Sequence, residues 1–448
     1  MTPTRYWCER ALVGGEVRSR VVVTTDDERI TEVTPDTDPP AGATRLMGVV
    51  LPGVANAHSH AFHRALRGHV QHNRGSFWTW RDVMYRVAER LDPDRYHRLA
   101  RAVFAEMMQA GFTSVGEFHY LHHQGDGTPY DDPNEMGAAV LTAANDAGIR
   151  ITLLDTVYLH GGLDAAGHRP IEGVQRRYRD ADVDAWAERV AAIEAGPGTR
   201  VAAALHSVRA VDAASARAVA DWTADRDVVL HVHLSEQPAE NEACLTAYGT
   251  TPALLLADAG ALTERTTVVH ATHLTDADIA TLGAARVSAC ICPTTERDLA
   301  DGIGPTVGLA SAGVGLCIGT DSHASIDPFE EARAVELDER LRSGRRGTHA
   351  AADLIEMATR HGHRALGWGD AGALEVGMRA DLVAVDLGSV RTAGATDGSA
   401  LESVLFAATS ADVTDVIVDG RCVVVGGRHA SIDAAAELTR AIAEVIAP

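Results

Sequence analysis

Two histidines separated by one residue follow an apolar run near the start of the sequence. Residues 49–52 are Val-Val-Leu-Pro, Gly53 comes next, and His58-Ser59-His60 stands five residues later. An apolar run that ends at Pro-Gly predicts a buried strand that has just ended. In an extended chain His58 and His60 point to the same side, because side chains alternate with period 2. Such a pair is half of a catalytic metal site, although by itself it could equally belong to a polar loop.

Ionisable residues also follow most of the later apolar runs. Burying such residues costs free energy unless they are paired, so stability alone gives no reason to place them at strand ends. Metal ligation together with acid–base chemistry accounts for them as a group. The residues concerned are Glu117, His119, Tyr120, His206, Arg209, His231, His233, Glu236, His270 and Asp321.

Three imidazoles and one carboxylate form a donor set that suits Zn²⁺, with Fe²⁺ as the alternative. The predicted ligands of one divalent metal are His58, His60, His233 and Asp321. A bound metal lowers the pKa of its water towards ~7, which supplies hydroxide at neutral pH. Asp321 would accept the proton of that water, and Glu236, one helical turn beyond His233, would carry a proton to a leaving nitrogen. His270 would polarise the electrophile or hold the developing charge.

The elements that must position these residues alternate between apolar strands and amphipathic helices. This rhythm predicts a parallel sheet and, with eight strands, a (β/α)₈ barrel whose active site lies at the C-terminal strand ends. Helices are expected at residues 96–110, 135–147 and 252–259. The strands expected after the first one are residues 112–120, 150–158, 200–207, 228–234, 267–270, 286–293 and 314–321.

Both ends of the chain have a different pattern. Residues 18–23, 29–34, 380–386 and 413–421 alternate polar and apolar side chains around turns, which is typical of short antiparallel strands. We therefore predict a small β-sandwich domain from residues 1–47 and 376–448, with a final helix at residues 434–446. Residues 48–375 then form the metal-dependent catalytic barrel.

Composition narrows the class of partner. The 448 residues carry a formal net charge of −22, which repels nucleic acid and anionic membranes. The six cysteines are scattered without a Cys-x-x-Cys pair, as in a reducing compartment. We find no signal pattern and no apolar run of 18 residues, and so expect a cytoplasmic protein.

The motifs resemble those of the amidohydrolase superfamily, and the resemblance covers nearly the whole chain. Its deaminases are similar at His58-Ser59-His60, at residues 233–236, at Val269-His270 and at residues 319–322. Within the superfamily the chain most resembles the formimidoylglutamate deiminases. The stretches that carry this second resemblance are residues 56–62, 77–81, 117–123, 205–211, 233–237 and 292–296.

The resemblance implies hydrolysis of N-formimidoyl-L-glutamate to N-formyl-L-glutamate and ammonia, as in histidine degradation, by a homodimer with one divalent metal, usually zinc. Carried over by position, the substrate contacts are Arg81, Tyr120, His206 and Arg209. His63 stands where the family often has Gln, and it could still donate one hydrogen bond. Independently, arginine forks bind carboxylates, and this substrate has two of them.

Several alternatives stay open at this point. A deaminase of the same superfamily could act on a purine, an adenosine derivative or a triazine; such substrates favour stacking residues, yet aromatic residues make up 5% of the chain. A barrel without chemistry would be expected to lack a ligand or an acid–base residue. Arg209 could be a surface partner of Asp212, and Arg81 could form a salt bridge on its own helix. His231 points to the same side as His233, and a role at the site and a supporting or packing role are equally open for it. His273 is expected to be a loop residue.

Overall fold

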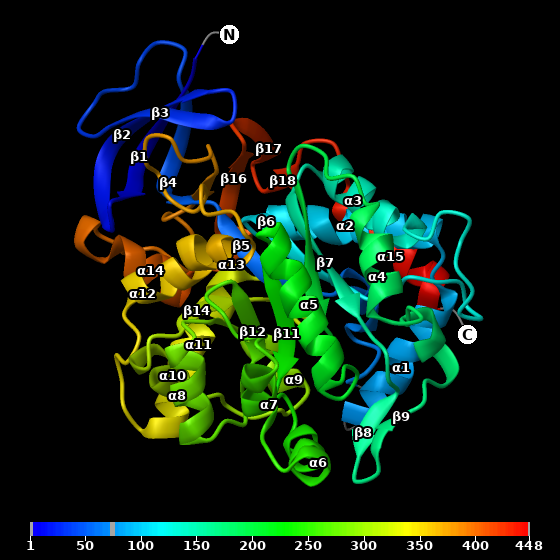
Figure 1. The fold of residues 1–448 in the computed structure, drawn as a ribbon. Helices are drawn as coiled ribbons and strands as arrows, with labels where there is room; N and C mark the ends of the chain where they lie inside the picture. The colour runs from blue at the N-terminus through cyan, green and yellow to red at the C-terminus, as the bar shows by residue number, and fades with distance from the viewer. Residues whose placement is uncertain (1–2, 72–76, 447–448) are drawn as a thin grey trace.

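Eight parallel strands form the barrel in a computed structural model that describes residues 3–71 and 77–446, with the side chains of residues 77 and 78 outside the description (Figure 1). The strands follow one another around the sheet in chain order, and each neighbouring pair is parallel. This arrangement confirms the predicted barrel. Its strands are β5 (Val54–Ser59), β6 (Phe112–His119), β7 (Arg150–Val157), β10 (Thr199–Leu205), β11 (Leu230–Leu234), β12 (Thr266–His270), β13 (Ser288–Ile291) and β14 (Gly315–Ile318).

The seam of the barrel lies where the first strand meets the segment after the last one. The backbone N–H of Asp321 donates to the carbonyl of His58 at 3.0 Å, and that of His60 donates to the carbonyl of Asp321 at 3.1 Å. Gly319 permits this approach, because a Cβ built on it would lie 2.8 Å from Cβ and 2.9 Å from the backbone nitrogen of His58. The backbone hydrogen bonds that close the barrel therefore also position three of the four predicted ligands.

We expect Gly319→Ala to lower stability by about 1–3 kcal/mol and to reduce bound metal, because the added methyl overpacks the seam against backbone. Denaturant midpoints and metal content measure the two effects. Gly196→Ala is the matched control, since its Cβ would meet nothing within 4 Å. Equal stability and metal content in the two variants would contradict this account of the seam.

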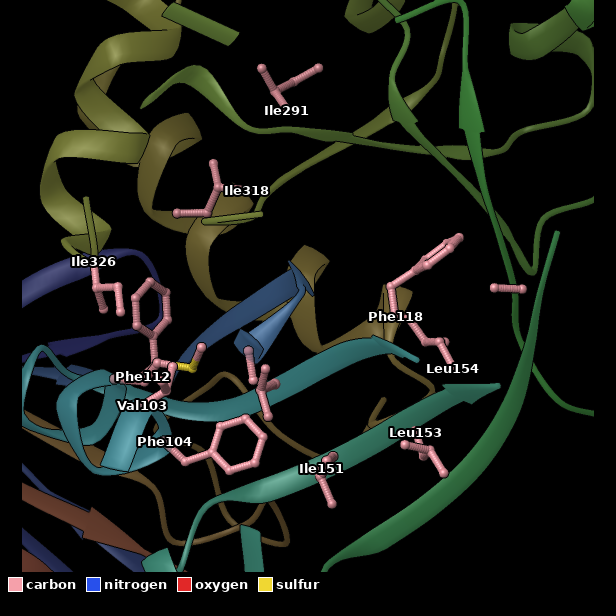
Figure 2. Packing of buried hydrophobic residues seen from close by; sticks show 14 of the residues in the cluster. Val103, Phe104, Phe112, Phe118, Ile151, Leu153, Leu154, Ile291, Ile318 and Ile326 are labelled. Carbon is pink, nitrogen blue, oxygen red and sulfur yellow. The ribbon is translucent and has the colours of Figure 1, made fainter. Parts of the chain in front are cut away.

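Helices separate the barrel strands and lie on their outer side (Figure 1). Helix α2 (Pro93–Gln109) begins where Asp92 accepts a hydrogen bond from the backbone of Arg95, and α3 (Glu135–Ala147) ends at Gly148, with φ 82°. Figure 2 shows Phe104 of α2 near Phe112 of β6 and Ile151 of β7, within one hydrophobic cluster. The other long helices are α1 (Phe77–Arg90), α4 (Val183–Ala191), α5 (Ala213–Arg226), α6 (Pro238–Tyr248), α8 (Asp276–Ala284), α11 (Pro328–Ser343), α14 (Ala400–Ala407) and α15 (Ala434–Ile446).

In the part that the structure describes, no helix combines the length and apolar character needed to cross a membrane.

A short hairpin and several short helices make up the remaining regular structure. A two-stranded hairpin, β8 (Gly162–Asp164) and β9 (Gly167–Arg169), follows β7. The short helices are η1 (Ala61–Leu66), η2 (Gly173–Arg177), α7 (Pro252–Asp258), α9 (Pro293–Asp298), α10 (Thr306–Ser311), α12 (Ala351–Glu356), η3 (Met357–His361), α13 (Gly362–Ala365), η4 (Asp397–Ser399) and η5 (Ser410–Asp412).

The two ends of the chain meet in one mixed sheet beside the barrel (Figure 1). Arg150, at the start of β7, ties this sheet to the barrel by donating to both carboxylate oxygens of Asp381, at 2.7 and 2.9 Å, with both side chains buried. The same guanidinium contacts Asp419 at 2.5 Å. In order, the sheet's strands are β18 (Arg428–His429), β17 (Arg421–Val425), β16 (Val413–Val418), β15 (Leu382–Val385), β4 (Thr44–Pro52), β1 (Thr4–Val13), β2 (Glu16–Asp26) and β3 (Arg29–Thr34).

The apolar run at residues 49–52 belongs to this mixed sheet, so its interpretation as the first barrel strand was wrong. It is part of β4, which pairs with β1 and β15, while the barrel starts anew at Val54. The predicted boundary between residues 47 and 48 thus falls inside β4. The run at residues 49–52 and all of β5 are buried, so hydrophobicity continues across Gly53 and only long-range pairing separates the two strands. His58 consequently lies within its strand rather than after it.

Candidate active site

The four predicted ligands lie together at the carboxyl ends of the barrel strands, and all four are buried. Nε2 of His58 lies 3.1 Å from Nε2 of His233 and 3.4 Å from Oδ1 of Asp321. Nε2 of His60 lies 3.4 Å from the same carboxylate oxygen. His58 and His60 come from β5 and the turn after it, His233 comes from β11, and Asp321 comes from the turn after β14, so the barrel brings together three distant pieces of chain.

Backbone carbonyls determine which ring nitrogens carry protons. Nδ1 of His233 lies 2.8 Å from the carbonyl oxygen of His206, and Nδ1 of His60 lies 3.0 Å from that of Phe118. A carbonyl only accepts hydrogen bonds, so both Nδ1 atoms donate. In the neutral rings Nε2 then presents a lone pair, towards Nε2 of His58 in one case and the carboxylate of Asp321 in the other.

The lone pair of His60 Nε2 and the carboxylate oxygen of Asp321, 3.4 Å apart, repel each other unless a cation lies between them. Burial lowers the pKa of His60 to about 3, so this ring is neutral at pH 7, as a ligand must be. Imidazole nitrogens and a carboxylate oxygen are donors that Zn²⁺ and Fe²⁺ accept. The residues present therefore fit a divalent metal, and the individual ligand assignments stay predictions.

His270, the last residue of β12, faces the two carboxylates predicted to move protons. Its Nε2 lies 3.9 Å from Oε1 of Glu236 and 3.9 Å from Oδ2 of Asp321, and its Nδ1 donates to Glu296 at 3.4 Å. Burial alone would lower the pKa of His270, but Glu236 and the hydrogen bond to Glu296 raise it to about 10. Nε2 of His270 thus faces both carboxylates, and an N–H at this position can stabilise negative charge.

Glu236 reaches the site from an irregular turn, so the expected helical turn after His233 was wrong. Strand β11 ends at Leu234, Ser235 adopts φ 50°, and α6 begins only at Pro238. The left-handed backbone conformation of Ser235 turns the chain directly after the strand. The carboxylate of Glu236 therefore faces His270 at the strand ends.

A buried hydrogen-bond network behind the ligands contains residues that the sequence did not single out. Ser59, between the two ligand histidines, donates to Glu117 at 2.6 Å and lies 3.2 Å from Nε2 of His323. Thr320, next to Asp321, lies 2.8 Å from Nδ1 of His323 and accepts from Asn56 at 2.7 Å. Burial raises the pKa of Glu117 to about 8. The network fixes the backbone on both sides of the seam, and only the position of Glu117 at a strand end hinted at it.

All five predicted substrate contacts line one pocket together with the predicted ligands His233 and Asp321. His63 and Tyr120 lie together, with Nε2 2.9 Å from the hydroxyl, and Tyr120 packs against His206 with ring centroids 5.9 Å apart. Arg81 lies over the ring of Tyr85, 5.4 Å from its centroid. Their contacts with substrate stay predictions, but the structure brings these side chains to the same cavity as His233 and Asp321.

Arg209 points into this pocket instead of pairing with Asp212. Its Nε donates to Glu240 at 3.0 Å, and a terminal nitrogen lies 3.6 Å from Glu236. Asp212 instead caps helix α5 and contacts His160. The guanidinium is held on one edge by Glu240 and retains further N–H donors for a ligand.

Aromatic side chains are abundant in the pocket, although the composition predicted few. The reason is local concentration: an overall content of 5% says nothing about where the rings gather. Gln175 donates to the hydroxyl of Tyr158 at 2.9 Å, which satisfies one of the buried polar ends. The aromatic residues that line the pocket are Trp80, Tyr85, Tyr120, Tyr158 and Tyr178.

Other histidines have structural partners. His231 contacts the carbonyl of Ala365 at 2.9 Å, and His273 contacts that of Asp301 at 2.7 Å. His119 and His122 lie beside Asp155, but both oxygens of this carboxylate accept from Arg189, at 2.8 and 2.9 Å. That second cluster is therefore a buried ion pair with flanking imidazoles.

The fold and this site can be set against known proteins. Residues 49–423 match the amidohydrolase family. A formimidoylglutamate deiminase from Pseudomonas aeruginosa is 37% identical, over 98% of this chain and 98% of its own length. The chain belongs to the amidohydrolase family. With the buried histidine cluster, this membership makes it a metal-dependent hydrolase.

Solved structures of family members agree with the fold. An amidohydrolase from Brucella melitensis superposes with a TM-score of 0.90 at 32% identity, covering 99% of this chain and 100% of the other. An adenosine deaminase from Xanthomonas campestris with bound zinc gives a TM-score of 0.83 at 25% identity, covering 98% and 97%.

Proposed function

We propose that this amidohydrolase is a deiminase that hydrolyses N-formimidoyl-L-glutamate to N-formyl-L-glutamate and ammonia. The observation that carries the proposal is the charge pattern of the pocket: Glu236 and Asp321 lie at its metal end, and Arg81 and Arg209 lie in the same lining. The relative from Pseudomonas aeruginosa supports the same substrate.

The substrate has a matching distribution of charge. Its formimidoyl group is an amidine, which is basic, and it ends in two carboxylates. Carboxylates of the protein favour the amidine, whereas guanidinium forks favour the carboxylates by bidentate hydrogen bonds. A protein with a net charge of −22 needs such local arginines to attract a dianionic tail.

The cation would be held by His58, His60, His233 and Asp321, with zinc favoured by the donor set and by the zinc-containing relative. When bound, it supplies Lewis acidity that lowers the pKa of water at the site. Glu236 and Asp321 move the protons: Asp321 accepts one from the attacking water, and Glu236 gives one to the amidine nitrogen.

These transfers balance the reaction. Water adds to the formimidoyl carbon as Asp321 takes one of its protons and Glu236, protonated at the start, gives a proton to the terminal nitrogen. Glu236 then takes the hydroxyl proton of the tetrahedral intermediate and gives it to the same nitrogen, the carbon–nitrogen bond breaks, and ammonia leaves as the carbonyl forms. The proton held by Asp321 returns to Glu236, which restores both carboxyl groups.

Glu296 holds His270 at Nδ1. His270 then stabilises the negative charge that develops on the reacting substrate, beside the carboxylates of Glu236 and Asp321. The predicted homodimer plays no part in this scheme and stays a prediction.

A substrate panel tests the proposal. We expect ammonia release from N-formimidoyl-L-glutamate to exceed that from adenosine, guanine or 8-oxoguanine by at least about 10³ in kcat/KM, because those compounds leave the buried charges of the pocket unpaired. Treatment with a chelator should abolish ammonia release, and added Zn²⁺ should restore it.

A second candidate is a deaminase of a purine or an adenosine derivative. The aromatic lining of the pocket favours it, since rings such as Tyr158 and Tyr178 offer stacking surfaces to a nucleobase. Turnover of a nucleobase with none of formimidoylglutamate would establish this alternative and refute the proposed substrate.

A further inference from the structure

A hydrogen bond ties the turn that carries Glu236 to a distant segment of the chain. The side-chain amide of Gln237, the next residue, donates to Oδ1 of Asp301, 64 positions further along. Asp301 follows helix α9 and is 3% exposed. The irregular turn between β11 and α6 is therefore fastened to a buried carboxyl group from another part of the barrel.

The carboxylate of Glu236 has no close ion pair of its own among the described residues. It lies 3.6 Å from Arg209 and 3.9 Å from His270, and both distances are longer than a hydrogen bond. Regular backbone pairing does not fix it either, because β11 ends at Leu234 and α6 begins at Pro238. Its position therefore depends on what holds the backbone of the turn.

The backbone of Asp301 makes two further links to the same site. Its carbonyl accepts from Nε2 of His273 at 2.7 Å, and the backbone N–H of His273 donates to the carbonyl of Ser235 at 3.0 Å. Its own N–H donates to the carbonyl of Glu296 at 2.9 Å, and the side chain of Glu296 accepts from Nδ1 of His270. Through these contacts Asp301 is linked both to the turn after β11 and to His270.

The chain adopts an unfavourable backbone conformation beside Asp301. Ala300, directly before it, has φ 59°, in the left-handed region that residues other than glycine rarely adopt. Ala300 is itself exposed, so the conformation does not serve its own side chain. Strain of this kind persists where the surrounding contacts impose it, and it is typical of functional sites. The strain at Ala300 therefore indicates that the orientation of Asp301 matters.

Stability alone gives no reason for an aspartate at this position. Oδ2 of Asp301 is buried and has no hydrogen-bond partner among the described residues. Burial, together with the charge of Glu236, raises the pKa of this carboxyl group, so its charged form is disfavoured here. Burying a carboxyl group that is only partly hydrogen-bonded costs free energy. What the carboxyl group provides is the acceptor for Gln237.

We propose that Asp301 is a positioning residue that holds Glu236 in its reactive orientation through Gln237. This inference rests on the proposed function, in which Glu236 transfers protons to the leaving nitrogen. Proton transfer requires the carboxyl group to lie within hydrogen-bond reach of the substrate, so a small displacement of the turn slows the reaction. Other residues bind the carboxylates of the substrate, so kcat should respond to loss of the bond and KM should not.

Asp301→Ala tests the proposal against Asp301→Asn. The alanine variant loses the acceptor, and we expect kcat of the zinc-loaded enzyme to fall about 10–100-fold while KM stays within about 3-fold. Asn keeps an acceptor oxygen, so its kcat should stay within about 3-fold of the wild-type value. Asp298→Ala is the matched control, because Asp298 is exposed and bonds to Gln71 instead. An unchanged kcat for Asp301→Ala, or an equal loss for Asp301→Asn, would overturn the proposal.

The partner of the bond gives a second test. Gln237→Leu removes the donor and should lower kcat by the same factor as Asp301→Ala. The double variant should lose no more than either single variant, within about 2-fold, because both changes break one interaction. Losses that multiply in the double variant would mean that the two residues act separately, contrary to the proposal.

Hydrogen exchange followed by mass spectrometry tests the contact without a substrate. The amides of residues 235–237 should exchange at least about 10-fold faster in Asp301→Ala than in the wild type or Asp298→Ala, because the turn loses a fixed point. Equal exchange in the three proteins, or a uniform increase along the whole chain, would count against a local role. If the wild type does not hydrolyse formimidoylglutamate, the proposed function falls, while this local difference still decides whether Asp301 holds the turn.

Discussion

Replacing Glu236 with Gln should reduce kcat for ammonia release by about 10²–10⁴-fold while the protein keeps its full metal content. Gln has the same shape but cannot deliver a proton, and Glu236 is not among the four predicted ligands. The carboxylate lies 3.9 Å from Nε2 of His270, so the lost group faces the site directly. Steady-state kinetics and elemental analysis of the same sample measure both quantities.

Glu242→Gln is the matched control, because Glu242 lies exposed on helix α6 a short distance along the chain. Its kcat should stay within about 2-fold of the wild-type value. Near-normal turnover by the Glu236 variant would remove this residue from the mechanism, and a simultaneous loss of metal would mean that it acts as a ligand.

Replacing Asp381 with Asn should cost about 3 kcal/mol of stability at pH 7, because it leaves the buried guanidinium of Arg150 with an incomplete set of carboxylates. Asp419 remains in contact with Arg150, which limits the loss. Chemical denaturation, followed by circular dichroism, gives the difference. Asp397→Asn is the control, since Asp397 is 70% exposed in its ion pair with Arg10 and should contribute less than about 1 kcal/mol.

The stability difference should also depend on pH. Burial would raise the pKa of Asp381, but the guanidinium of Arg150 outweighs it and holds the pKa below its ordinary value. A carboxyl group with a lowered pKa in the folded state stabilises the fold above its unfolded pKa, near 4, and loses this contribution as pH falls through the folded value. Wild type and Asp381→Asn should therefore differ fully at pH 5–7 and converge below about pH 4; a constant difference would contradict the assignment.

Local pattern was sufficient to locate much of the fold. The helices predicted at residues 135–147 and 434–446 have the same bounds in the structure, because their amphipathic faces, and the Gly148 that ends the first helix, are encoded nearby. The ligand cluster was also accessible, since parallel strands place their carboxyl ends at one edge and the residue types there revealed the chemistry.

Features set by distant partners were not accessible from the sequence. The division between β4 and β5 depends on which strands pair with each, and the buried pair Arg150–Asp381 joins residues 231 positions apart. His323 likewise gains its role only when the seam brings it to Ser59.

The seam joins segments that are synthesised at very different times, which affects when the site can bind metal. Asn56 and Thr320, which bond across it, are 264 positions apart, so the nascent chain holds its first two histidines long before the aspartate that faces them is synthesised. A polypeptide that ends before Asp321 lacks one of the four predicted ligands, and we expect it to bind the divalent metal poorly. Metal binding should therefore begin only after the last barrel strand has been synthesised and folded. The bound cation should also slow opening of the barrel at its seam, because it bridges side chains from both sides.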